Sequence, residues 1–150
     1  MMIKRIIYAI IVLLWMITVF SFSSQNGEES QGTSDVFTYK IMEIFNLSDK
    51  DNAIQIKEWI SFIIRKFAHF GIYCIGGFFI YGFFDTFNIE KKKVILFTIM
   101  SGMLYACFDE IHQSFVLERA GQIRDVLIDT SGICFITLLR FFKSSSSVKE

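Results

Sequence analysis

The sequence predicts an all-α membrane protein, a four-transmembrane-helix bundle with short amphipathic helices in the outer loop between spans one and two. Of the 150 residues, 53% are hydrophobic, and the mean hydropathy is +0.47. Eighteen residues are Phe and none is Pro. The apolar residues form four runs, each near the roughly 20 helical residues that cross a hydrocarbon core. At this length the chain is predicted to be a single domain, residues 1–150.

The four spans are predicted at about residues 6–22, 60–84, 94–116 and 123–142. The first run has a second interpretation, a cleaved signal peptide, because Ser21-Phe22-Ser23 loosely fits a small-x-small cleavage site. Its apolar core is longer than the usual 7–15 residues of such signals, which favours an uncleaved anchor. Whether the first span is cleaved stays open at this point.

The segment between the first two spans is expected to contain short helices on the outer surface. Residues 24–34 are polar and contain glycine, which is typical of a loop. Thr33 or Ser34 is expected to cap a short amphipathic helix, and a second amphipathic piece follows Asp51. Trp59 suits the membrane interface. One or two interfacial helices are therefore predicted, with a partly ordered loop as the alternative.

The distribution of Lys and Arg predicts the orientation, because cytoplasmic flanks are enriched in these residues. With four spans, one side holds Lys4, Arg5, Lys91, Lys92, Lys93, Arg140, Lys143 and Lys149. The other side holds an acid-rich segment with Glu28, Glu29, Asp35, Glu43, Asp49, Asp51 and Glu58. Arg119 and Arg124 weakly oppose the rule. Both termini are therefore predicted to be cytoplasmic.

Ionisable residues gather where the last three spans meet the outer side. The groups are Arg65, Lys66 and His69 in span two; Asp109, Glu110, His112 and Gln113 in span three; and Arg124, Asp125 and Asp129 in span four. Helical spacing places Lys66, His69 and Tyr73 on one face, and Asp109 and His112 on another. Charges inside a membrane are expensive and usually functional, so a polar cavity open to the outer side is expected.

Several classes of function are disfavoured by the sequence. The balance of 15 basic and 15 acidic residues gives no electrostatic footprint for nucleic acid. No nucleotide-binding glycine loop, nucleophile elbow, haem motif or zinc motif is present. The three cysteines lie inside apolar runs, where they are expected to pack in lipid. A transporter is disfavoured because the polar groups stop at one membrane level.

At these residues the sequence resembles the VanZ-like family of bacterial membrane proteins. The matching pieces are Phe22-Ser23-Ser24-Gln25, Arg65-Lys66-Phe67-Ala68-His69-Phe70 with Tyr73, Tyr105, the run from Asp109 to Val116, and Arg119, Asp125, Asp129 and Gly132. The resemblance covers about residues 5–140. Family members often have Pro-Gly before the arginine, whereas this chain has Leu117-Glu118, so the conformation of that turn stays open.

The resemblance implies a role at the bacterial cell envelope, and the family's namesake is associated with resistance to the glycopeptide antibiotic teicoplanin. The first hypothesis is a site for a lipid-linked or peptidoglycan-related ligand. Lys66, Arg119 and Arg124 suit phosphate or carboxylate groups. The residues expected to bind are Ser24, Gln25, Lys66, His69, Glu110, Gln113, Arg119 and Asp125. The sequence names neither the ligand nor the oligomeric state.

Two other interpretations of the polar cluster remain open. In a membrane-embedded hydrolase, Asp109, His112 and Asp129 would form a general acid–base set, because histidine titrates near neutral pH. His69, His112 and the acids would also offer ligands to a metal that activates water, although no HExxH-type spacing is present, and no cofactor is identified. In the structural interpretation, Asp109 pairs with Lys66, or Asp129 with His112, and the pairs only fix helix register.

Overall fold

Five helices make up the computed structural model, which describes residues 1–48, 50 and 52–146. They are α1 (Met2–Ser23), α2 (Gly27–Ile44), α3 (Ala53–Asp85), α4 (Lys91–Gln113) and α5 (Ile123–Ser146). The prediction of an all-helical fold is confirmed. Three of the helices, α1, α3 and α4, are long and apolar enough to cross a membrane. Asp49, Asp51 and Lys149, which entered the topology argument, lie outside the described residues.

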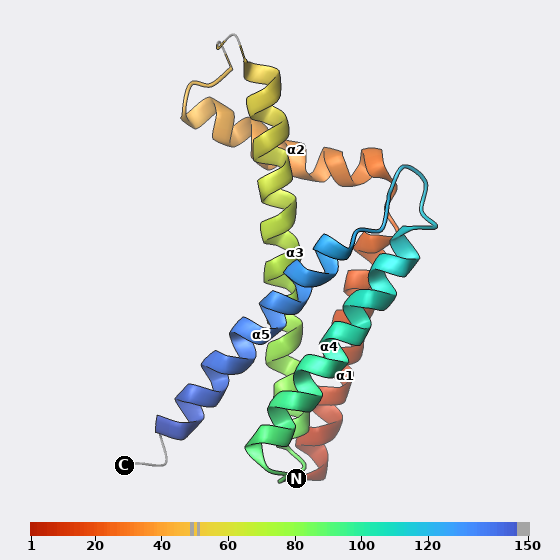
Figure 1. Ribbon diagram of the computed structural model, residues 1–150, viewed down its shortest axis with the longest axis vertical. Helices are drawn as coiled ribbons and strands as arrows, with labels where there is room; N and C mark the ends of the chain where they lie inside the picture. Colours follow the sequence, from red (N-terminus) through yellow and green to blue (C-terminus); the bar gives the residue numbers. More distant parts are fainter. Residues whose placement is uncertain (49, 51, 147–150) are drawn as a thin grey trace.

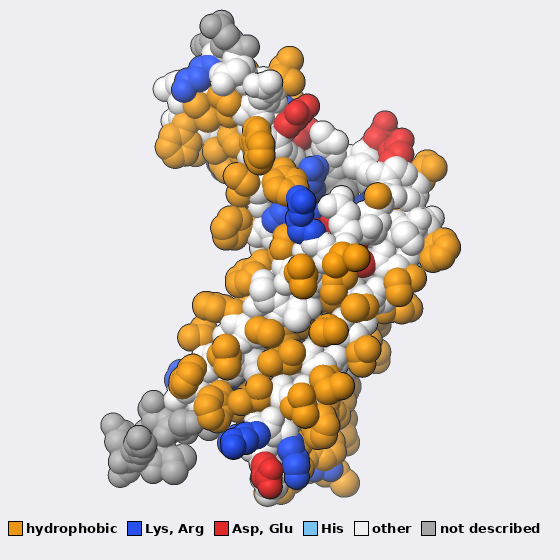
Figure 2. All heavy atoms as spheres, viewed as in Figure 1, with side chains coloured by type: hydrophobic (Ala, Val, Ile, Leu, Met, Phe, Trp, Pro, Cys, Tyr) orange, Lys and Arg blue, Asp and Glu red, His pale blue; other side chains and the backbone are white. Residues whose placement is uncertain are grey.

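The helices form a bundle with one transverse helix near its end (Figure 1). α1, α3 and α4 run along the long axis, α5 crosses them obliquely, and α2 lies across the end where α1 stops. α5 packs mainly against α3 and secondarily against α4. The start of α1 and the last turns of α5 lie at the opposite end from the α4–α5 connection. The outer surface along the shared length is largely apolar, and charged side chains gather towards the two ends (Figure 2).

α2 begins earlier than the sequence analysis placed it. The helix starts at Gly27, so the predicted loop over residues 24–34 and the predicted cap at Thr33 or Ser34 are wrong. The reason is a capping box: the Asn26 side chain accepts from the Glu29 N–H at 2.8 Å, and Glu29 accepts from the Asn26 N–H at 3.2 Å. The Asn-x-x-Glu pattern was visible in the sequence but was outweighed by the polar, glycine-containing composition.

α3 is longer than a single membrane crossing requires. Its 33 residues correspond to about 50 Å of helix, against a hydrocarbon core of about 30 Å. The amphipathic piece expected after Asp51 is therefore the first part of α3 and not a separate helix. This part holds α2 through a hydrogen bond of 3.0 Å between the Ser34 and Ser61 hydroxyls and an ion pair of 2.8 Å between Asp35 and Lys57.

Aromatic residues join α1 to α3 and α4 in the core. The Trp15 indole N–H donates to the Ile72 carbonyl at 2.8 Å, and the Trp15 ring lies 5.5 Å from Tyr73 and 5.1 Å from Tyr105. The Trp15 ring also fills the place that a side chain at Gly76 would take. Trp15 thus fixes the position of α1 just below the level where the polar residues begin.

Candidate functional site

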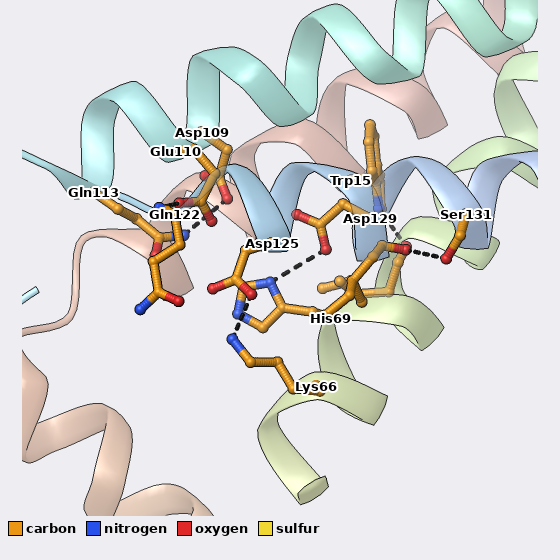
Figure 3. A network of polar contacts seen from close by, with 12 residues as sticks. Trp15, Lys66, His69, Asp109, Glu110, Gln113, Gln122, Asp125, Asp129 and Ser131 are labelled. Carbon is orange, nitrogen blue, oxygen red and sulfur yellow. Dashed lines mark hydrogen bonds and ion pairs between the residues drawn. The ribbon is translucent and has the colours of Figure 1, made fainter. Parts of the chain in front are cut away.

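Polar side chains from α3, α4 and α5 converge at the end of the bundle near α2 (Figure 3). Lys66 and His69 extend from α3 towards α5, which presents Asp125 and Asp129. The two residues on each helix are about one helical turn apart, so they lie on the same face of that helix. The facing pairs place two basic residues of one helix against two acids of the other.

Two ion pairs connect α3 to α5. Lys66 pairs with Asp125, and their side chains are 19% and 11% exposed. His69 Nδ1 lies 3.3 Å from Asp129 Oδ1, and the Asp129 side chain is fully buried. Neither oxygen of Asp129 has a hydrogen-bond partner within the described residues. A buried carboxylate without hydrogen bonds is costly, so His69 is its principal compensation.

The acids of α4 have different surroundings. Asp109 is 1% exposed and accepts a hydrogen bond from Gln113 Nε2 at 3.1 Å. Glu110 is 5% exposed and accepts from the backbone N–H of Gln122, directly before α5, at 2.7 Å. Glu110 therefore positions the start of α5, because an anion next to the N-terminus of a helix is stabilising.

His112 faces α1 and not α5. Its Nδ1 lies 3.4 Å from the Ser23 hydroxyl, and its ring lies 4.4 Å from the ring of Phe20. Two expected pairings are therefore wrong: Asp129 pairs with His69 instead of His112, and Lys66 pairs with Asp125 instead of Asp109. The crossing of α5 over α3 decides both pairings.

Two adjoining cavities lie between these helices and α2. The smaller, of about 280 Å³, is bordered by apolar and polar residues of α1, α2 and α3 whose atoms give it a mostly apolar wall, with Asp109, Gln113 and Arg119 also on its border. The larger, of about 480 Å³, lies among α2, α3, the α4–α5 connection and the start of α5, and its lining is mostly polar. Five residues border both cavities: Ser30, Arg65, His69, Gln113 and Arg119.

Arg119 enters this region from the α4–α5 connection. Its Nη1 lies 3.5 Å from the Ser23 carbonyl oxygen. Burial lowers the pKa of the Arg119 guanidinium below its usual range, Asp109 and Glu110 oppose this change, and Arg65 adds to it. Arg65 and Arg119 border both cavities, so their guanidinium groups face a shared space. Arg124, by contrast, is exposed and borders neither cavity.

Comparison with known families decides what kind of protein carries this site. A family model described as VanZ/LLP1 matches residues 8–143. The chain belongs to the VanZ/LLP1 family. No curated protein and no solved structure matches it. The resemblance seen in the sequence is confirmed, and the match includes every residue of the polar cluster at this end of the bundle.

Seven of the eleven residues predicted for the site border a cavity of this VanZ/LLP1 protein. They are Gln25, Lys66, His69, Asp109, Gln113, Arg119 and Asp125. The other four, Ser24, Glu110, His112 and Asp129, border neither cavity. Ser24 donates to the Phe20 carbonyl at 2.8 Å, which completes the end of α1. Asp129 pairs with His69, which borders both cavities.

Arg65 is the residue that the site prediction missed. It borders both cavities, although it was predicted only as part of the charge cluster of span two. The available signal was its spacing, because Arg65 lies four residues before His69 and therefore on the same helical face. Within the described residues, no group of three or more His, Cys, Asp or Glu is placed to hold a metal ion.

The turn that departs from the VanZ-like pattern keeps a backbone suited to glycine. Glu118 has a φ of +61°, in the left-handed region that favours glycine. The turn packs closely on α2: the Gly27 N–H donates to the Leu117 carbonyl at 3.3 Å, and a Cβ on Gly27 would collide with Glu118. Glu118 therefore holds a backbone conformation that glycine would adopt without a steric penalty.

Glu118→Gly is expected to raise the free energy of unfolding by about 0.5–1 kcal/mol. A non-glycine residue in the left-handed region costs about 1–2 kcal/mol, from which the higher entropy of the unfolded glycine chain is subtracted. Thermal unfolding of the purified protein in detergent measures the change. Ala120→Gly in the same connection is the control, because φ is not positive there and only the entropy loss applies. A Tm of Glu118→Gly at or below that of Ala120→Gly would show that Glu118 is unstrained.

Proposed function

We propose that the protein crosses the bacterial cell membrane four times, with α5 as the fourth span and both termini in the cytoplasm. The ion pairs of Asp125 and Asp129 with α3 support the fourth span, because they keep its acids away from lipid. The bias of Lys and Arg towards the end that holds the start of α1 supports the orientation. The polar cavity then faces the extracytoplasmic side.

The function we propose is the binding of an envelope or lipid-linked ligand in the polar cavity, contributing to glycopeptide resistance. The observation that carries it is the 480 Å³ cavity bordered by ionisable groups of α2, α3, the α4–α5 connection and α5. Ligand sites of small molecules are concave and hold a few converging polar groups. Membership of the VanZ/LLP1 family directs the choice of ligand to the envelope, and the family's namesake supplies the link to teicoplanin.

Teicoplanin susceptibility of the host tests this proposal. A strain lacking the protein is compared with strains that carry wild type, His69→Gln or Lys40→Gln at matched membrane abundance. Lys40 is the control, because it is exposed on α2 and borders neither cavity. Wild type and Lys40→Gln are expected to lower susceptibility, and His69→Gln is expected to resemble the strain without the protein. If wild type changes nothing, this protein has no resistance role; if His69→Gln retains the effect, the cavity is not the working part.

A membrane-embedded hydrolase is the second candidate, favoured by the pairing of His69 with Asp129. His69 borders both cavities, and the buried Asp129 behind it would orient the imidazole and stabilise its charged form, the arrangement of a general base. Asp109, on the wall of the smaller cavity, would complete the set. His112 is less suited to this role, because it faces Phe20 and Ser23. Incubation of purified protein with host lipid extract, followed by mass spectrometry, would detect a product that His69→Gln should not form.

A further inference from the structure

Among the described residues, Arg65 and Arg119 border both cavities and form no ion pair with an acid. Lys57 pairs with Asp35, Lys66 with Asp125, and His69 with Asp129. No carboxylate forms an ion pair with Arg65 or Arg119 anywhere in residues 1–48, 50 and 52–146. Both side chains are partly buried, and both border the two cavities. Two positive charges thus face shared space without an ion-pair partner among the described residues, although Asp109 borders the smaller cavity and Glu28 and Glu118 border the larger.

An anion between them would pair with both guanidinium groups. Like charges at close range repel, more strongly where water is partly excluded. A guanidinium presents several N–H donors in a planar fork that matches phosphate and carboxylate oxygens, so two arginines can hold one such group from two sides. Lys66 and His69 are less available for this purpose, because they already pair with Asp125 and Asp129.

The two cavities differ in chemistry on either side of these arginines. The smaller is bordered by apolar side chains that include Val19, Phe22, Phe37, Ile64 and Ile72. Phe22 and Phe37 are also exposed on the outside of the bundle, by 51% and 60%, so the apolar wall continues into surface that would face hydrocarbon. The larger cavity is bordered by polar groups such as Glu28, Gln31 and Gln122. A ligand held by the arginines would therefore have an apolar space on one side and a polar space on the other.

We propose that the ligand is an anionic amphiphile, with a phosphate or carboxylate group held between Arg65 and Arg119 and a hydrocarbon chain in the cavity between α1, α2 and α3. This inference rests on the proposed ligand-binding function and adds the chemical class and the two residues that recognise it. The polar remainder of the head group would extend into the larger cavity. A water-soluble anion lacks the part that matches the apolar cavity.

Three probes test the contributions of the anionic head group and of the hydrocarbon chain separately. Dodecyl phosphate has the chain and the anion, dodecyl maltoside has the same chain with a neutral head, and inorganic phosphate has the anion alone. The purified full-length protein in dodecyl maltoside micelles is titrated with dodecyl phosphate or with inorganic phosphate, and Tm is followed. A ligand that binds only the folded state raises Tm with concentration. We expect a saturable rise with dodecyl phosphate and none with inorganic phosphate at the same concentration.

Variants test whether the rise in Tm comes from binding of dodecyl phosphate in the cavities. Arg65→Gln and Arg119→Gln are each expected to weaken the apparent affinity for dodecyl phosphate by about tenfold or more, the value of one charge-assisted contact. Ala68→Leu, which adds bulk at the wall of the apolar cavity, should weaken it as well. Lys40→Gln removes one positive charge at an exposed site outside both cavities and corrects for the general attraction of an anionic micelle.

Each outcome of the titration has a definite meaning. An equal response to inorganic phosphate would overturn the amphiphile in favour of a free anion. A response that Arg65→Gln and Arg119→Gln share with Lys40→Gln would overturn the arginine pair. No response of the wild-type protein, with the host phenotype intact, would overturn this inference alone. Loss of the host phenotype with binding intact would overturn the proposed function instead.

Discussion

Asp129→Asn is expected to leave the bundle folded and to abolish the effect of the protein on host susceptibility. Asn keeps the shape of the side chain but removes the negative charge that faces His69 at 3.3 Å. The charge is fully buried and neither oxygen has a hydrogen bond within the described residues, so its loss relieves a desolvation penalty. The same change leaves His69 without the group that orients it at the border of both cavities. Function should therefore be lost while stability is kept.

Two measurements on the same variant test this expectation. Tm of the purified protein in detergent should equal or exceed that of wild type, and susceptibility of the complemented strain should match the strain without the protein. Glu43→Gln is the control, because it removes one acid from an exposed position on α2 outside both cavities. A marked fall in Tm would identify the His69–Asp129 pair as a structural lock. If the variant protects the host as well as wild type does and its Tm is also that of wild type, the charge of Asp129 contributes neither to function nor to stability.

Lys66→Met is expected to lower the free energy of unfolding by about 3–5 kcal/mol, the largest stability effect we predict. The change leaves Asp125, whose side chain is 11% exposed, without its counter-charge between α3 and α5. The double variant Lys66→Met/Asp125→Leu should recover most of the loss, because two apolar side chains replace the pair without an isolated charge. Denaturant titration of the single and double variants in detergent measures the coupling between the residues.

A surface ion pair of the same chain provides the contrast. Lys93 lies 3.6 Å from Glu90, and both side chains are more than half exposed. Lys93→Met is therefore expected to change the free energy of unfolding by less than about 1 kcal/mol. If Lys66→Met is as mild as Lys93→Met, the Lys66–Asp125 pair is accessible to water and the polar cavity is more open than its lining suggests.

The fold class and the level of the polar cluster were predictable because both depend on local properties. Span length follows from counting apolar residues against the bilayer, and the four predicted runs lie within or overlap α1, α3, α4 and α5. The third helix ends at Gln113 and not near Val116, because the chain turns there towards the close contact with Gly27. The start of α2 was missed when composition was preferred over the Asn26 capping box.

The sequence by itself determined that the chain is a VanZ/LLP1 membrane protein with its ionisable residues gathered at one end of the helices, because apolar length and helical periodicity are properties of single segments. Only the tertiary structure decided which of these residues meet. The angle at which α5 crosses α3 pairs Asp129 with His69 and Asp125 with Lys66. The position of α2 across the bundle end and the path of the α4–α5 connection bring Arg65 and Arg119 to one shared space. Helix rotation and crossing depend on packing between segments, so no pattern within one segment specifies them.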